Sequence, residues 1–252
     1  HWQDPHLKFL EEPHVYLWDD KPIRVSATGI IDRYFGKFNG MDTVNKWYDG
    51  WKVNKNSKYG ALIRYLLQVQ GKDDQFAKQA ICALWESDGD ASAGLGTKMH
   101  KQIEQDVMGY EIRDFEAMPE LIQFRKWFAE FVRVGNWQLY APEKLLVKLE
   151  PESGTPVWAG AADCILRSLD DPNKYALLDW KRVDPKGSTV LLGHQASYPN
   201  TDGFGREPFD KVPNTKTGKY TVQLNIYAHT LFTDYGIDVR DHMYMVQIFH
   251  SL

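Results

Sequence analysis

Two aspartates and a lysine on neighbouring apolar segments are the residues best suited to chemistry. Asp179 and Lys181 end the run from 174 to 181, and Asp163 lies in the apolar run from 156 to 166. Side chains two positions apart on a strand share a face, so Asp179 and Lys181 should point the same way. The polar stretch between the two runs is typical of a turn. A hairpin would therefore place Asp163 beside Asp179.

Two acidic side chains held close together repel each other unless a positive group lies between them. A divalent cation with oxygen ligands is a common solution, and we expect Mg²⁺ or Mn²⁺. Such an ion lowers the pKa of a bound water and orients it for attack on phosphorus. Lys181 would lie on the attack side and offset charge on the phosphate. The alternative is a surface hairpin with a solvated Asp–Lys pair, since short motifs also occur by chance.

Helical spacing adds two further pairs of polar residues. His100 and Glu104 lie four residues apart, which places them on one face of a predicted helix. His100 is a candidate metal ligand, and Glu104 is the partner that would orient it. Gln223 and Tyr227 have the same spacing in a later predicted helix. The alternatives are a surface His–Glu pair and a core-facing tyrosine beside a capping glutamine.

In this order, the elements resemble the PD-(D/E)xK nuclease superfamily, in particular its RecB-like and lambda-exonuclease-like branch. The matching patterns are Gly-Thr-x-x-His-x-x-x-Glu at 96–104, Gly-x-x-Asp at 160–163, Asp-x-Lys at 179–181 and Gln-x-x-x-Tyr at 223–227. They span more than half of the chain. The long segment between the lysine strand and the glutamine helix departs from the branch's usual pattern.

The resemblance implies a restriction-endonuclease-like core and a role for each matching residue. The implied metal ligands are an imidazole, two carboxylates and a backbone carbonyl, from His100, Asp163, Asp179 and Trp180. Both aspartates would also be catalytic, Lys181 would be the catalytic lysine, and Glu104 of the family helix would join them. Gln223 and Tyr227 would line the nucleic-acid side of the site.

Further candidate contacts to nucleic acid lie near the start of the chain. Ser26 and Thr28 are candidate caps of a predicted helix whose first amide groups could bind a phosphate, although capping alone explains the hydroxyls. Residues 46–64 carry five basic residues against one acidic residue, with aromatic residues between them, which suits contact with backbone and bases. Three lysines there are the candidates: Lys52, Lys55 and Lys58. The alternative is a solvated helical face with its aromatic side chains turned inward.

The apolar periodicity predicts the α/β fold class, with a central mixed β-sheet flanked by helices. Helices are expected at 41–56, 59–70, 73–87, 93–109, 117–134 and 220–235, and strands at 144–150, 157–166, 175–182 and 240–249. The region before residue 25 is expected to be irregular. We expect a mainly helical N-terminal region, 1–92, packed on a nuclease core, 93–252, in which the loop 184–218 forms a flap.

Composition fits a globular enzyme. The chain has 252 residues and a net charge of −4, which argues against coating nucleic acid over the whole surface and favours local phosphate contact. No apolar run approaches the roughly 20 residues of a membrane span, so no membrane partner is expected. The two cysteines fit a reducing, intracellular compartment and are too few for the iron–sulfur cluster of some branch members. A start at His1 suggests a piece of a larger multidomain protein, from which a targeting signal could have been removed.

The sequence therefore predicts a Mg²⁺- or Mn²⁺-dependent nuclease that hydrolyses phosphodiester bonds with metal-activated water. A DNA exonuclease is favoured, with single-stranded DNA or duplex ends as the partner and RNA as a second candidate. One alternative is a catalytically inactive nucleic-acid-binding module of a larger assembly. Another is an endonuclease that acts on RNA or structured DNA.

Overall fold

The computed structural model describes residues 3–112, 118–183 and 203–249. The chain forms two compact units, one from residues 1–36 with 98–252 and the other from residues 37–97. This division differs from the predicted one, because the first 36 residues belong with the sheet-containing unit. We refer to the two parts as the sheet unit and the helical unit.

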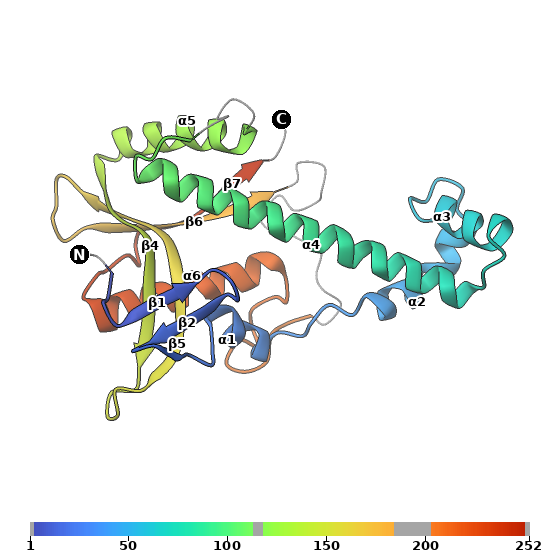
Figure 1. Cartoon of the computed structure of the whole chain (residues 1–252), viewed down its shortest axis with the longest axis horizontal. Coiled ribbons are helices and arrows are strands. Elements are labelled where there is room, and N and C mark those ends of the chain that lie inside the picture. Colours follow the sequence, from blue (N-terminus) through green and yellow to red (C-terminus); the bar gives the residue numbers. More distant parts are fainter. Residues whose placement is uncertain (1–2, 113–117, 184–202, 250–252) are drawn as a thin grey trace. The chain divides into compact units, whose positions relative to one another are not determined.

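A four-stranded mixed sheet lies at the centre of the sheet unit (Figure 1). Its strands, in spatial order, are β4 (Trp137–Leu149), β5 (Pro156–Ser168), β6 (Tyr175–Val183) and β7 (Met243–Phe249). The first three are antiparallel neighbours, and β7 runs parallel to β6. In β6, Leu177 packs on one face and Leu178 and Trp180 on the other. Burial on both faces explains why this strand reads as a continuous apolar run.

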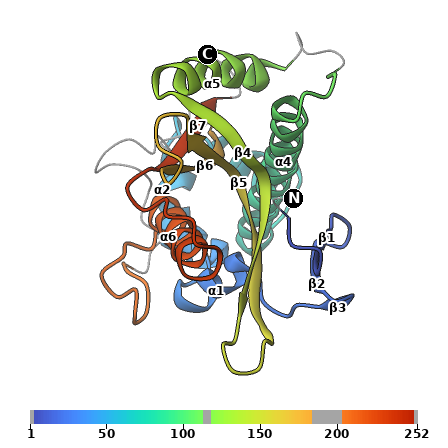
Figure 2. The same cartoon turned by 90° about the vertical axis from the view of Figure 1, so that its left-hand side faces the viewer.

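Helices cover both faces of this sheet (Figure 2). The first face carries α1 (Ala27–Tyr34) and α6 (Lys216–Tyr235), and the opposite face carries α5 (Pro119–Val134) and the end of α4 (Asp74–Val107). The helix α6 ends at Tyr235, as predicted, and Gly236 caps it with a φ of +67° that suits glycine. The mixed α/β class predicted from the sequence is confirmed at this level.

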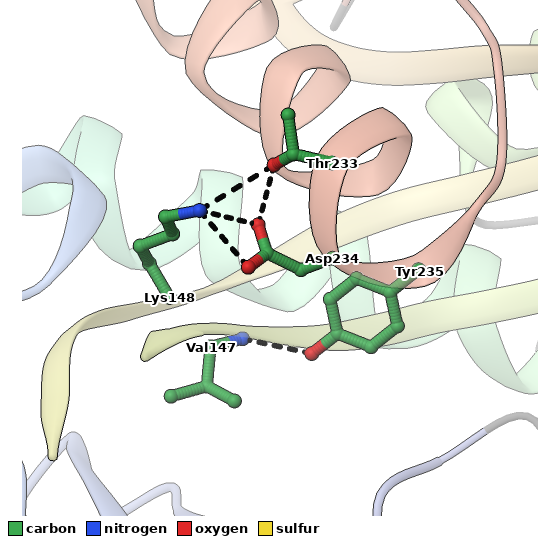
Figure 3. A network of polar contacts seen from close by, with 5 residues as sticks. All are labelled: Val147, Lys148, Thr233, Asp234 and Tyr235. Carbon is green, nitrogen blue, oxygen red and sulfur yellow. Dashed lines mark hydrogen bonds and ion pairs between the residues drawn. The ribbon is translucent and has the colours of Figure 1, made fainter. Parts of the chain in front are cut away.

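The end of α6 is tied to β4 by a polar network (Figure 3). Lys148 Nζ lies 2.8 Å from Asp234 Oδ2, and the Val147 N–H donates to the Tyr235 hydroxyl at 3.0 Å. Because β4 is at the edge of its sheet, this N–H would otherwise lack a partner from a neighbouring strand. The network thus fixes α6 against the sheet and occupies part of the β4 edge.

The first residues form a small antiparallel sheet, so the prediction of an irregular region was wrong. Its strands are β1 (Leu7–Leu10), β2 (Val15–Trp18) and β3 (Lys21–Pro22). Leu7 and Tyr16 are buried against Val147 and Ala159 of the larger sheet. Strands of two to four residues place at most two side chains on a face. This number is too small for an alternating pattern to be recognised in the sequence.

The helical unit contains α2 (Gly40–Val53), α3 (Gly60–Arg64), η1 (Tyr65–Val69) and the first part of α4. The helices predicted at 73–87 and 93–109 are one continuous helix, α4. Each interior glycine weakens a helix by only about 1 kcal/mol, and buried residues such as Ile81 and Ile103 anchor α4 on both sides of the glycine-rich stretch. Among the described residues, no helix combines the length and apolar character needed to cross a membrane.

The proposed flap at 184–218 is only partly described. Residues 184–202 lie outside the described residues. The remainder is integrated into the fold, because Phe204 forms a β-bridge with Pro213 and the Arg206 N–H donates to the Tyr34 carbonyl at 2.7 Å. Lys216 already begins α6. The predicted loop therefore ends at residue 215, and its role as a flap stays a prediction.

Candidate functional site

Asp163 and Asp179 meet where the ladder between β5 and β6 ends. The paired positions run from Arg167 and Tyr175 to Cys164 and Leu178, so the next position sets Asp163 opposite Asp179. There, the Asp163 side chain replaces the ladder: its Oδ2 accepts a hydrogen bond from the Trp180 N–H at 2.6 Å. The predicted hairpin is confirmed. It also brings the Trp180 peptide to the site, while the Trp180 side chain is buried on the opposite face.

Lys181 points to the same face of β6 as Asp179, as predicted. Its ammonium lies 2.7 Å from Asp179 Oδ2 and 3.5 Å from Gln223 Oε1, and 4.5 Å from the centre of the Tyr220 ring. The side chain is only 15% exposed. Burial alone would lower the pKa of Lys181, but Asp179 and Asp163 outweigh it and raise the pKa, so the ammonium stays charged.

His100 of α4 and Glu143 of β4 complete a group with Asp163. His100 Nδ1 lies 3.4 Å from Asp163 Oδ1, and one ligand atom from each of the three residues lies within 4.8 Å of the others. Two ligands of one cation at bond lengths of about 2.1 Å are separated by no more than about 4.2 Å, so this spacing needs little adjustment. Carboxylate oxygens suit Mg²⁺ or Mn²⁺, whereas an imidazole is the more usual ligand of Zn²⁺, Fe or Ni. The two carboxylates of the group therefore fit the expected ion.

Glu143 is the site residue that sequence reasoning missed. In the register of β4 and β5, Pro142 pairs with Cys164 and Lys144 with Ala162, so Glu143 is opposite Asp163. Its φ is +41°, a conformation that non-glycine residues rarely adopt. The predicted strand begins one residue later, at 144, and so leaves Glu143 outside it. A lone acidic residue at the edge of that apolar run was the available signal.

The carboxylates of this group influence one another strongly. Burial raises the pKa of Glu143 to about 9 and the pKa of Asp179 to about 6, and the Asp163 charge adds to both shifts. Burial also opposes ionisation of Asp163, but His100 and Lys181 outweigh it and lower its pKa. Burial would lower the pKa of His100, but Asp163 raises it. Asp163 and Asp179 are thus ionised at neutral pH while Glu143 keeps its proton, and a bound cation would relieve the repulsion among the three.

Two further residues interact electrostatically with the group. Burial raises the pKa of Glu104, one helical turn from His100, and Glu104 in turn contributes to the raised pKa of Glu143. Glu104 is not in the three-residue group. Tyr16, from the small N-terminal sheet, is buried and has its pKa raised by burial and then by Glu143 and Asp163. The N-terminal region therefore contributes to the surroundings of the site.

Gln223 and Tyr227 lie at different depths. The Gln223 amide donates to the Tyr227 hydroxyl at 3.0 Å, and its oxygen faces Lys181. Tyr227 is 3% exposed and packs so closely on β5 that a Cβ at Gly160 would lie 3.0 Å from its hydroxyl. Gln223 thus reaches the site, whereas Tyr227 is a core residue that supports it. The close approach also explains the glycine of the Gly-x-x-Asp pattern.

The remaining predicted contacts are spread over both units. Ser26 caps α1 as predicted, accepting from the Gly29 N–H at 3.0 Å, and Thr28 is exposed in the first turn. The three lysines belong to the helical unit: Lys52, Lys55 and Lys58.

These lysines differ in their surroundings. Lys52 pairs with Asp74 at 2.8 Å, Lys58 lies over the Tyr59 ring, and Lys55 is exposed. Of the neighbouring aromatic residues, Tyr48 is buried in the unit's core, whereas Trp47 is half exposed. The alternative of inward-turned aromatic side chains therefore holds for Tyr48 and not for Trp47.

A scan against protein-family models found no match, and searches of curated proteins and of solved structures found no similar protein either.

Proposed function

We propose that this chain is a Mg²⁺- or Mn²⁺-dependent nuclease with a restriction-endonuclease-like core of the PD-(D/E)xK superfamily. One observation carries the proposal: His100, Glu143 and Asp163 converge beside the buried ion pair of Asp179 and Lys181. An Asp–Lys pair with a purely structural role would not need two further carboxylates and an imidazole beside it. Titratable groups with strongly shifted pKa values cluster at functional sites.

The chain's own residues divide the work between cation binding and phosphate binding. His100, Glu143 and Asp163 would hold the cation, with Asp179 beside them. When bound, a divalent cation supplies Lewis acidity, which lowers the pKa of water and offsets charge on a phosphate. This chemistry requires no covalent intermediate with the protein.

Lys181 is the group best placed to act on the scissile phosphate. Asp179 on one side and Gln223 on the other limit the positions of its ammonium. A charged, buried ammonium can hold a water by hydrogen bonding and stabilise negative charge that grows on a phosphate oxygen. Because the raised pKa of Lys181 keeps it protonated, its role is electrostatic and not that of a general base.

The favoured activity is a DNA exonuclease. The net charge of −4 favours a local substrate contact, for which the exposed Thr28 and the capped start of α1 are candidates on the sheet unit. The Lys181 site itself is suited to any phosphodiester. The choice between ends and internal bonds is therefore made by other parts of the chain.

The test is digestion of end-labelled single-stranded and duplex DNA, circular DNA and RNA with Mg²⁺, Mn²⁺ or chelator. We expect linear DNA to be shortened only when a metal ion is present. Circular DNA should remain uncut. Lys181→Ala should lower the cleavage rate by about 100-fold or more, whereas Lys174→Ala, at the β5–β6 turn, should not change it. Binding without any product would instead favour an inactive module, and cut circles an endonuclease.

A further inference from the structure

The side chain of Gln3 is bound to the backbone of β4 on both sides of Lys144. Its Nε2 donates to the Glu143 carbonyl at 2.6 Å, and its Oε1 accepts from the Leu145 N–H at 2.9 Å. These groups lie on the outer edge of β4, in the same row as the Val147 N–H that Tyr235 binds (Figure 3). The Gln3 carboxamide thus takes the place of a neighbouring strand at this edge.

The residue held in this way has an unusual backbone. Glu143 has a φ of +41°, which costs about 1–3 kcal/mol for a non-glycine residue and persists only where the surroundings enforce it. On one side, β5 pairs with the residues before and after it. On the other side, Gln3 binds the Glu143 carbonyl. The direction of the Glu143 side chain depends on this backbone conformation.

Gln3 is itself held in place by the small N-terminal sheet. The Leu7 N–H donates to the Asp4 carbonyl at 3.2 Å, and Leu7 and Tyr16 are buried against Val147 and Ala159. Only three residues separate Gln3 from this packed strand. The clamp is therefore supported by tertiary packing as well as by two hydrogen bonds.

We infer that Gln3 is a positioning residue for the cation-binding group, acting through the backbone of Glu143. The inference rests on the proposed function, because it assigns Gln3 to the same site. Groups that orient metal ligands without touching the metal typically contribute 10- to 100-fold to metal affinity. Gln3 would do so from a point 140 residues away in the sequence.

The chain offers a matched control at the other edge of the sheet. Gln123 Nε2 donates to the Phe249 carbonyl at 2.7 Å, and the Phe249 N–H faces Gln123 Oε1 at 3.4 Å. The same type of side chain thus makes the same type of clamp on β7, the strand farthest from β4. Losing either clamp should have a similar effect on folding, but only Gln3 binds a residue of the cation-binding group.

The experiment compares Gln3→Met with Gln123→Met by calorimetric titration of Mn²⁺ and by thermal unfolding without metal. We expect Gln3→Met to bind Mn²⁺ about 10- to 100-fold more weakly than the wild type, and Gln123→Met to bind it with unchanged affinity. Both should lower Tm by a similar few degrees. In a Glu143→Gln background, Gln3→Met should cause no further loss, because its effect passes through Glu143.

Three results would overturn the inference: unchanged Mn²⁺ affinity in Gln3→Met, equal losses in the two methionine variants, or additive losses of Gln3→Met and Glu143→Gln. Failure of the proposed function has a different signature. If Mn²⁺ binding depends on Gln3 but no nucleic acid is cleaved, the inference stands and the nuclease is rejected. If the wild type binds no Mn²⁺ while DNA is still cleaved, the inference is rejected and the nuclease needs another site.

Discussion

At the residue scale, three carboxyl groups of the site lie so close together that they cannot all be ionised without a bound cation. Asp163 is ionised because His100 and Lys181 stabilise its charge, and this charge in turn hinders ionisation of Glu143 and Asp179. The metal-free protein therefore retains protons that a cation would displace.

The pH dependence of stability tests this arrangement. The pKa of Glu143 is raised from its ordinary 4.5 to about 9. A raised carboxyl pKa means that the stability present below pH 4.5 is lost as the pH rises toward 9. We expect the Tm of the metal-free protein to fall between pH 6 and pH 9. The Tm of Glu143→Gln should fall less steeply over the same range, as followed by circular dichroism. Parallel curves for the two proteins would show that Glu143 is ionised throughout.

The sequence predicted part of the site at this scale. Asp179 and Lys181 were assigned to one face because alternation in a strand is strict, and His100 because helical spacing is regular. Glu143 could not be found in the same way, since its role depends on a positive φ and on its register opposite Asp163. Gln3 and Tyr16 contact residues more than 100 positions away, which no local pattern encodes.

At the scale of elements, the contact between α6 and β5 aligns Gln223 with Lys181. Gly160 permits this contact, because a Cβ there would lie 3.0 Å from the Tyr227 ring and 3.2 Å from Ala27 Cβ. Periodicity predicted long elements such as β5 and α6 to within a few residues. The four-residue strands near the start were not predicted, because they are defined by packing on the larger sheet.

A pair of identical substitutions tests the role of this contact. Gly160→Ala should destabilise the protein by about 1–3 kcal/mol, because the new methyl group displaces Tyr227 or Ala27. Gly89→Ala, inside α4 with no atom within 4 Å of the added Cβ, should stabilise it by about 0.5–1 kcal/mol. Urea unfolding measures both free energies. Stabilisation by Gly160→Ala would mean that α6 does not approach β5 as closely as described.

At the scale of the whole molecule, the chain separates a sheet unit with the cation-binding group from a helical unit with basic and aromatic residues. Composition indicated a globular α/β protein but not this division, because the long helix α4 belongs partly to each unit. The predicted boundary at 92 lies within α4. The first 36 residues group with the sheet unit through contacts with β4 and β5, which local patterns do not encode.

The lysines of the helical unit give a prediction at this scale. Lys52 is paired with Asp74, whereas Lys55 is exposed. Lys55→Ala should therefore reduce the slope of log K for DNA binding against log salt concentration by the amount of about one phosphate contact. Lys52→Ala should reduce this slope by less. Fluorescence anisotropy over a range of salt concentrations measures the slope. Identical slopes for wild type and Lys55→Ala would exclude Lys55 from the DNA-binding surface.

Locating the bound cation would test the proposed site itself. Crystals of the protein soaked in Mn²⁺ and measured at the manganese absorption edge reveal the ion by its anomalous scattering. We expect a peak within bonding distance of His100, Glu143 and Asp163 and close to Asp179. A peak elsewhere, or none at a Mn²⁺ concentration that saturates any binding in solution, would contradict the proposed site.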